Sequence, residues 1–316
     1  MEMLRVRLAG PPELVGRLAE TLHDDPYAFD LAVQRATGAT QTDDVVECHV
    51  LAGAANQLLR ELRALGAGDR VSLTVEPVAL ASSATAEQAE RRLLGPLARA
   101  PVWELVRARI HADGIYRPSF YLLLVAAGVI GAVGILTNSQ ILVVGAMVVG
   151  PEYGAIANIA LGLNRWDPHR VGRAVRALVI GFALAVAATF AFAALVRAFD
   201  LQPLAYENGV RPVSHMVGTP NFYSLVVAVA AGVVGVVSLT LDRSATLLGV
   251  FISATTIPAA ADMGVAWAFG SWDEGLASAG QLGLNLLVLI VAGALTLFAQ
   301  QRIWRRIRER PADVTG

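Results

Sequence analysis

Two carboxylates stand inside stretches that are otherwise apolar enough for a lipid bilayer. Glu152 follows Gly150-Pro151 in the run GAMVVGPEYGAIANIALG, and Asp262 lies in the run SATTIPAAADMG. A carboxylate at bilayer depth costs about 2.5 kcal/mol or more, so such residues are functional candidates by default. A buried carboxylate suits proton exchange, and one that faces water suits cation binding. The pair therefore predicts a site for a proton or a cation.

Proline interrupts both of these stretches, at Pro151 and at Pro258. Proline lacks the N–H that a helix interior uses, so each stretch is expected to break. A broken helix exposes N–H groups at one half-helix end and C=O groups at the other, which bind an anion or a cation respectively. The alternative is a structural kink whose backbone groups are satisfied by neighbouring helices. In this alternative, Glu152 has an arginine or backbone partner inside the helix bundle, and Asp262 lies at the outer mouth of the membrane domain.

Polar residues near the two breaks complete the candidate site. Asn158 and Asn285 either line the same cavity as the carboxylates or bond across helices. The predicted substrate-binding or ion-binding residues are Gly150, Pro151, Glu152, Asn158, Thr255, Thr256, Pro258 and Asp262.

Catalytic and metal signatures are missing from the sequence. There is no HExxH, GxxxxGK[ST] or GxSxG motif, and the five histidines show no ligand spacing. We therefore expect no cofactor, no metal site and no enzyme. An intramembrane enzyme that uses the two carboxylates is a third reading, which needs them within about 10 Å of each other, as in carboxylate-pair hydrolases.

The composition is that of a membrane protein. Of the 316 residues 55% are hydrophobic and 16% are charged, against about 25% charged in soluble domains. Residues 119–136 carry no charge over 18 positions, which is long enough to span a bilayer. Six spans are predicted, at about 119–136, 139–163, 174–197, 222–241, 244–269 and 276–301.

Arginine placement predicts the orientation. Arginines crowd the segment before the first span, the loop between the second and third spans, and the segment after the sixth, while the opposite connections hold few. The positive-inside rule then places both termini in the cytoplasm. The start, MEMLRVRLAG, has no basic and apolar signal-peptide pattern. We expect a multi-pass protein of the bacterial inner membrane.

Residues 1–80 predict a separate α+β domain. Period-2 strands alternate with amphipathic helices in the order βαββαβ, the ferredoxin-like split unit that ACT regulatory domains also use. This segment holds 12 acidic residues against 7 arginines, which excludes a nucleic-acid-binding face. Residues 81–118 read as amphipathic linker helices broken near Pro96 or Pro101, 119–301 as the membrane domain, and 302–316 as a basic cytoplasmic tail. The single Cys48 excludes an intramolecular disulfide.

Six spans divide into two halves of three, and an odd number per half makes the halves opposite in orientation. A shift of 104 residues sets Asn138 on Asp242, Gly145 on Gly249 and Asn158 on Asp262. The expected fold is therefore an α-helical polytopic membrane protein with a 3+3 inverted repeat, in which the second and fifth spans are broken.

The membrane segment resembles a known family. Gly145-Ala146-Met147, then Gly150-Pro151 and Gly154, followed by an Ala/Leu/Gly-rich helix, look like the DUF389 family of bacterial membrane proteins. The second small-residue run, which leads to Pro258 and Gly264, fits the family's other landmark. The resemblance covers about 119–301, and a preceding βαββαβ module matches the common family arrangement. Glu152-Tyr153 departs from the pattern, because many members have apolar residues there. The resemblance implies the fold and the membrane location but no substrate.

The leading functional hypothesis is an inner-membrane transporter or channel for an ion or small polar solute. Its site would lie where the broken second and fifth spans meet, and the cytoplasmic domain would regulate or assemble it. The alternative is a non-transporting sensor or scaffold that binds a ligand or partner through its cytoplasmic domain. The expected partners are the lipid bilayer, further copies of the chain, and a small solute or ion, but no nucleic acid.

Overall fold

The computed structural model describes residues 2–36, 43–78, 84–89, 100–218, 221–241 and 255–309. The chain forms two compact units. One contains residues 1–107 with 302–316, and the other contains residues 108–301.

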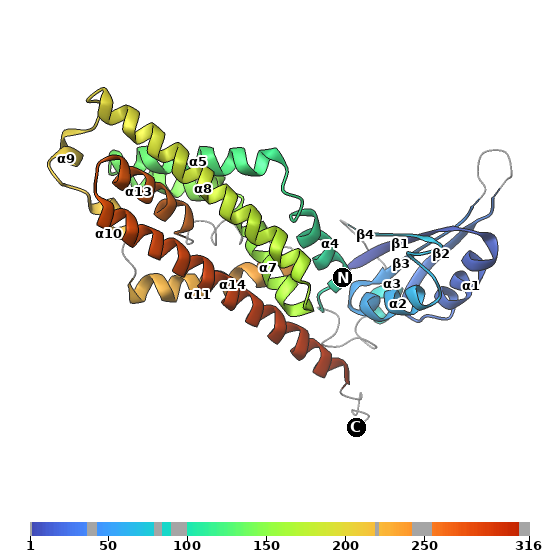
Figure 1. The fold of residues 1–316 in the computed structure, drawn as a ribbon. Helices are drawn as coiled ribbons and strands as arrows, with labels where there is room; N and C mark the ends of the chain where they lie inside the picture. Colours follow the sequence, from blue (N-terminus) through green and yellow to red (C-terminus); the bar gives the residue numbers. More distant parts are fainter. Residues whose placement is uncertain are drawn as a thin grey trace. The chain divides into compact units, whose positions relative to one another are not determined.

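The first unit is built on an antiparallel sheet (Figure 1). Its elements are β1 (Met3–Gly10), α1 (Pro12–His23), β2 (Ala28–Gln34), β3 (Asp44–Leu51), α2 (Ala52–Ala64) and β4 (Ser72–Pro77). The strands lie in the order β2-β3-β1-β4, and each neighbouring pair is antiparallel. The βαββαβ order expected from the sequence is observed, while the assignment to the ferredoxin-like fold stays a prediction.

Period-2 alternation decides which face of this sheet is buried. Leu4, Val6 and Leu8 of β1 are buried together with the apolar residues of β3 and of both helices. The residues between them face outward, and Arg5 Nε donates to Glu47 Oε1 over 2.7 Å on the opposite side of the sheet. The sheet therefore packs one face on α1 and α2 and exposes a charged face.

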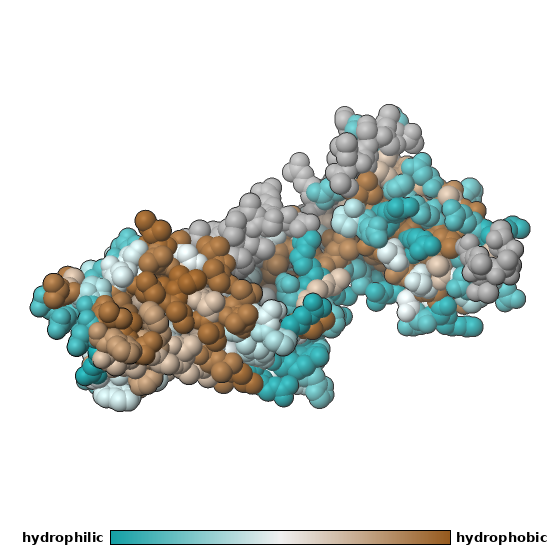
Figure 2. Space-filling model, turned by 90° about the horizontal axis from the view of Figure 1, so that it is seen from above, coloured by the Kyte–Doolittle hydropathy of each residue, from teal (hydrophilic) through white to brown (hydrophobic). Residues whose placement is uncertain are grey.

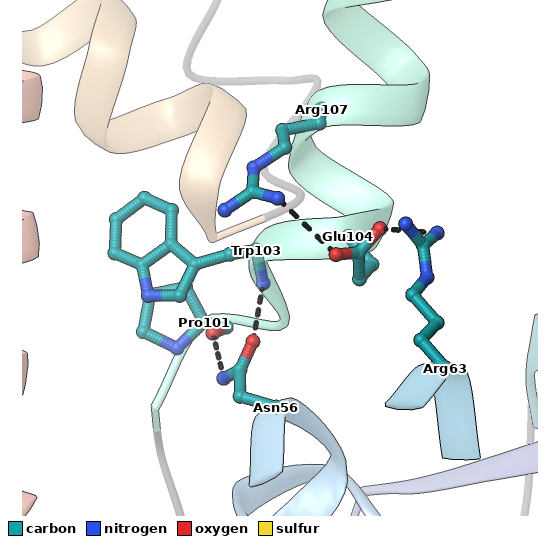
Figure 3. Close-up of polar contacts among 6 residues, drawn as sticks. All are labelled: Asn56, Arg63, Pro101, Trp103, Glu104 and Arg107. Carbon is teal, nitrogen blue, oxygen red and sulfur yellow. Dashed lines mark hydrogen bonds and ion pairs between the residues drawn. The ribbon is translucent and has the colours of Figure 1, made fainter. Parts of the chain in front are cut away.

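Two helices of the linker are described, α3 (Ala84–Ala89) and α4 (Trp103–Ala112). The Asn56 side chain, on α2, donates to the Pro101 carbonyl over 2.7 Å and accepts from the Trp103 N–H over 2.9 Å (Figure 3). Glu104 pairs with Arg63 of α2 and with Arg107. The first turn of α4 is thereby fixed to α2. Of the two predicted breakpoints, Pro101 lies two residues before the start of α4, and Pro96 lies outside the described residues.

The second unit is helical. Its elements are the end of α4, then α5 (Pro118–Leu136), α6 (Gln140–Val149), α7 (Glu152–Arg165), α8 (Pro168–Ala198), α9 (Leu204–Glu207), α10 (Pro212–Gly218), α11 (Phe222–Thr240), α13 (Thr256–Ala268) and most of α14 (Trp272–Glu309).

Four of these helices, α5, α8, α11 and α14, are long and apolar enough to cross a membrane. The pair α6 and α7 also passes this test when it is taken together, and its two helices are bent by 51°. Apolar residues dominate the visible surface of this unit, whereas polar residues dominate that of the first (Figure 2). These features indicate a membrane protein whose described residues include four helices able to span a membrane, or five such segments if the bent pair is one span. The predicted fifth span, 244–269, lies partly outside the described residues, so the count of six stays a prediction.

Three pairs of helices in this unit begin 104 residues apart. Pro118 opens α5 and Phe222 opens α11, and both helices have 19 residues. Glu152 opens α7 and Thr256 opens α13, while Pro168 and Trp272 open α8 and α14. The offset found in the sequence is thus also the offset between helix starts.

Candidate functional site

The candidate site begins at the break between α6 and α7. Gly150 has extended backbone angles, and Pro151 follows it as the residue before α7. Because Pro151 has no N–H to donate and its ring crowds the preceding turn, α6 cannot run on as a straight helix. The break therefore makes Glu152 the first residue of a new helix, where a carboxylate interacts favourably with the helix dipole.

Glu152 is buried, with 5% of its surface exposed. Thr256 Oγ1 donates to its Oε1 over 2.8 Å. Its other oxygen, Oε2, lies where a side chain on Gly150 would be and has no hydrogen-bond partner within the described part of the chain. Since Thr256 opens α13, two helix N-termini begin beside one carboxylate.

A row of polar side chains extends from this point along α14. Asn285 Nδ2 donates to Thr255 Oγ1 over 2.5 Å, and Gln281 Nε2 donates to Asn285 Oδ1 over 3.3 Å. Ser278, Gln281 and Asn285 recur at helical spacing in an apolar helix. Ser278 and Gln281 are absent from the predicted site residues, although polar residues at helical spacing in an apolar helix are a signal in the sequence that points to them.

A cavity of about 230 Å³ adjoins this row. Thr255 and Asn285 form one part of its wall, and Asn221, Tyr223 and Ser224 of α11 form another. The remaining lining residues are apolar: Met147, Met216, Val217, Val227, Ala228 and Leu289. None of the described lining residues is charged. This size and mixture suit a small solute, since ligand sites are apolar pockets with a few placed polar groups.

Asp262 belongs to a second cluster. It is 1% exposed and accepts a hydrogen bond of 2.6 Å from Ser278 Oγ at its Oδ2, while the buried Ser214 of α10 faces the same carboxylate. Six residues separate Asp262 from Thr256, so it lies about 9 Å further along α13 and about 120° around the helix. The two predicted carboxylates therefore occupy separate hydrogen-bonded clusters on one helix.

Asn158 lies apart from both clusters. Its Nδ2 donates to the Ile110 carbonyl over 2.6 Å, and its Oδ1 accepts from Arg170 Nη1 over 3.2 Å. Arg170 also contacts His111 Nδ1 at 3.3 Å. Asn158 thus joins the end of α4 to α7 and α8, which corresponds to the reading in which it bonds across helices.

The eight predicted site residues therefore separate into groups. Gly150, Pro151, Glu152, Thr255 and Thr256 gather at the starts of α7 and α13, with Pro258 buried in the first turn of α13. Asp262 and Asn158 take part in other contacts. Among the residues that the structure describes, no three His, Cys, Asp or Glu side chains come together to hold a metal ion.

Residues 147–291 match the model of a family described as a domain of unknown function, DUF389. No curated protein and no solved structure matches the chain. The matched residues include both clusters and the cavity, and they confirm the resemblance seen in the sequence. The chain therefore carries a DUF389 domain over residues 147–291.

Proposed function

We propose that this protein is an inner-membrane transporter or channel for an ion or a small polar solute. Its membrane domain consists of two inverted halves offset by 104 residues, and its site lies where α7 and α13 begin. The observation that carries the proposal is the hydrogen bond between Glu152 and Thr256, which are 104 residues apart and each open a helix.

Reciprocal contacts support the repeat. A two-fold axis relates two surfaces so that if residue i of one half meets j of the other, the equivalents of i and j also meet. Gly131 of α5 lies against Ile257 of α13, and its equivalent Gly235 of α11 lies against Tyr153 of α7, the equivalent of Ile257. A residue close to the axis contacts the equivalent residue of the other half, and Glu152 and Thr256 form such a pair.

A second reciprocal pair involves the long helices. Gly264 of α13 lies against Thr189 of α8, and Gly293 of α14 lies against Ala160 of α7. Within the halves, Gly128 lies against Ala185, and its equivalent Gly232 lies against Leu289. Small residues at these crossings let the helix backbones approach closely. The same packing is thus repeated at the same offset.

Inverted repeats with a broken helix in each half are the architecture of many secondary transporters, whose substrate sites lie at the interface of the repeats. The cavity beside Thr255 and Asn285 lies next to this interface and is the candidate solute site. In this proposal both termini are cytoplasmic, the first unit regulates or assembles the membrane domain, and the protein is a homo-oligomer.

Flux through purified protein tests the proposal. Proteoliposomes would be challenged with gradients of NaCl, KCl, glycerol, urea and alanine, and with a pH gradient, and followed by light scattering and a pH-sensitive dye. We expect the wild type to pass at least one of these faster than empty vesicles. Glu152→Gln should abolish that flux, while Glu207→Gln, an exposed carboxylate outside the site, should leave it unchanged.

One outcome would correct the mechanism, and another would contradict the function. Flux that survives Glu152→Gln unchanged would remove Glu152 from the mechanism. A folded wild type that passes none of the probes would favour the sensor or scaffold instead.

A further inference from the structure

Three polar residues form a buried stripe on α14, which we call the polar stripe: Ser278, Gln281 and Asn285. Each is at most 2% exposed. The stripe runs from Ser278 to Asn285, which at 1.5 Å per residue is about 10 Å of helix. Ser278 bonds to Asp262 at one end, and Asn285 bonds to Thr255 at the other, next to the Thr256–Glu152 pair. The stripe therefore joins the two carboxylate clusters.

Three oxygen atoms along this path have no hydrogen-bond partner among the described residues. They are Asp262 Oδ1, Gln281 Oε1 and Glu152 Oε2, and each belongs to a residue that is at least 95% buried. A buried polar atom without a partner is destabilising. All three are acceptors, so the missing partner is a donor or a positive charge. Two carboxylates exclude an anion, although helix N-termini by themselves would attract one.

The spacing of these oxygens favours protons over metal ions. A metal cation needs several oxygen ligands around one point. Here the acceptors are distributed along the stripe, and within the described ranges no three acidic, His or Cys side chains are placed so that they could hold a metal ion. A carboxylate, in contrast, binds a proton by itself and then becomes an O–H donor.

We propose that Asp262 and Glu152 are two proton-binding sites at the two ends of the polar stripe. This rests on the proposed transport function and identifies its ion as the proton. At each site a hydronium ion gives one proton to a carboxylate oxygen, which leaves a neutral carboxylic acid and a water molecule. The hydroxyls of Ser278 and Thr256 hold the other oxygen of each acid, and the amides of Gln281 and Asn285 position the segment between them.

The charged and titratable groups around the two sites differ. His215 of α10, Glu274 of α14 and Tyr206 of α9 act electrostatically on Asp262. Burial raises the pKa of Tyr206 to about 12, so this residue keeps its proton. Glu274 is paired with Arg211 at 3.2 Å. Tyr153 follows Glu152 in the chain, and its ring packs against Gly235 of α11.

Infrared difference spectroscopy of the full chain in lipid tests this proposal without relying on flux. Spectra recorded between acid and alkaline pH should contain two carbonyl bands of protonated carboxylic acids that shift in D2O. Glu152→Gln should remove one band and Asp262→Asn the other, while Glu207→Gln removes neither. Ser278→Ala, the milder variant should Asp262→Asn fail to fold, should shift the frequency of the Asp262 band alone.

The outcomes separate the two proposals. Bands that persist unchanged in the folded Glu152→Gln and Asp262→Asn variants would overturn the proton sites, as would their loss when NaCl or KCl is added at fixed pH. In either case, flux of another solute would still support the proposed transport function. Both bands present in a protein that passes no probe would keep the proton sites and contradict transport.

Discussion

Glu152 and Thr256 are separated by 104 residues and are joined by a hydrogen bond of 2.8 Å at the points where α7 and α13 begin. Glu152 supplies a buried carboxylate, and Thr256 supplies the hydroxyl that donates to it. The two helices thus begin at the same point and differ in the chemistry of their first residues.

Thr256→Val tests the energetic value of this bond. The substitution keeps the shape but leaves Glu152 Oε1 without its donor, so we expect a loss of about 1–3 kcal/mol in stability. Thr296→Val is the control, because the Thr296 hydroxyl donates to the Ala292 carbonyl of its own helix rather than to a carboxylate of another helix. Thermal melting in detergent should show a clear decrease in Tm for the first variant only. Equal decreases would contradict a special role for the bond.

Two glycines of the α6–α7 region should respond to alanine in opposite directions. A Cβ on Gly150 would overlap Glu152 Oε2 and lie 2.9 Å from Ile257 Cγ1, so Gly150→Ala should displace the carboxylate and destabilise the fold by about 1–3 kcal/mol. Gly145, in the interior of α6, has open space around it, so Gly145→Ala should stabilise by about 0.5–1 kcal/mol. Denaturation midpoints measure both, and a tolerated Gly150→Ala would show that the carboxylate can move freely.

The contact between Gly235 and Tyr153 predicts a rescue. Gly235→Ala would force a methyl group into the Tyr153 ring and should lower the free energy of unfolding by about 1–3 kcal/mol. Combining it with Tyr153→Val removes the ring, so the double variant should be more stable than the sum of the two single effects predicts. Gly280→Ala serves as the control, because a Cβ added there meets no other side chain or helix within 4 Å in the described part of the chain. Strict additivity in Tm would disprove the contact.

Asn56 should hold the first turn of α4 through its side chain. Asn56→Ala removes the bonds to Pro101 and Trp103 together, which leaves a buried carbonyl and N–H unpaired. We expect faster hydrogen exchange at the start of α4 and a loss of about 1–3 kcal/mol. Gln57→Ala, which removes only an exposed contact with Glu61, is the matched control and should leave the exchange rates unchanged.

Cys48 predicts a pH dependence of stability. Burial raises the pKa of its thiol to about 12, whereas an unfolded thiol has a pKa of about 8.5. The folded state therefore holds the thiol proton more tightly than the unfolded state does. The stability that the protonated thiol contributes is constant below about pH 8.5 and is lost as the pH rises from there towards 12.

Comparison of the wild type with Cys48→Ala isolates this effect. As the pH rises from 8 to 11, the denaturation midpoint of the wild type should fall more than that of Cys48→Ala. The only thiol of the chain should also react with iodoacetamide at pH 8 only after unfolding. Fast alkylation of the folded protein would contradict its burial.

Local rules determined much of this protein from its sequence. Period-2 alternation in residues 4–10 gave β1 its buried face, charge-free length gave α5, and Pro151 ended α6, because these patterns act through neighbouring residues. The offset of 104 residues that separates three pairs of helix starts is also visible in the sequence, because it can be read from residue types alone. Glu152 was recognised because a carboxylate is costly in an apolar stretch wherever its partner lies.

Tertiary structure decided which polar groups meet. Nothing local assigns Asn158 to Ile110 and Arg170, or Asp262 to Ser278, because those partners come from other helices and depend on how each helix is rotated in the packed unit. A rotation of about 100° per residue means that Thr256 and Asp262 face different neighbours although both lie on α13. The sequence by itself determined that buried charges exist, and only packing determined that Glu152 meets Thr256.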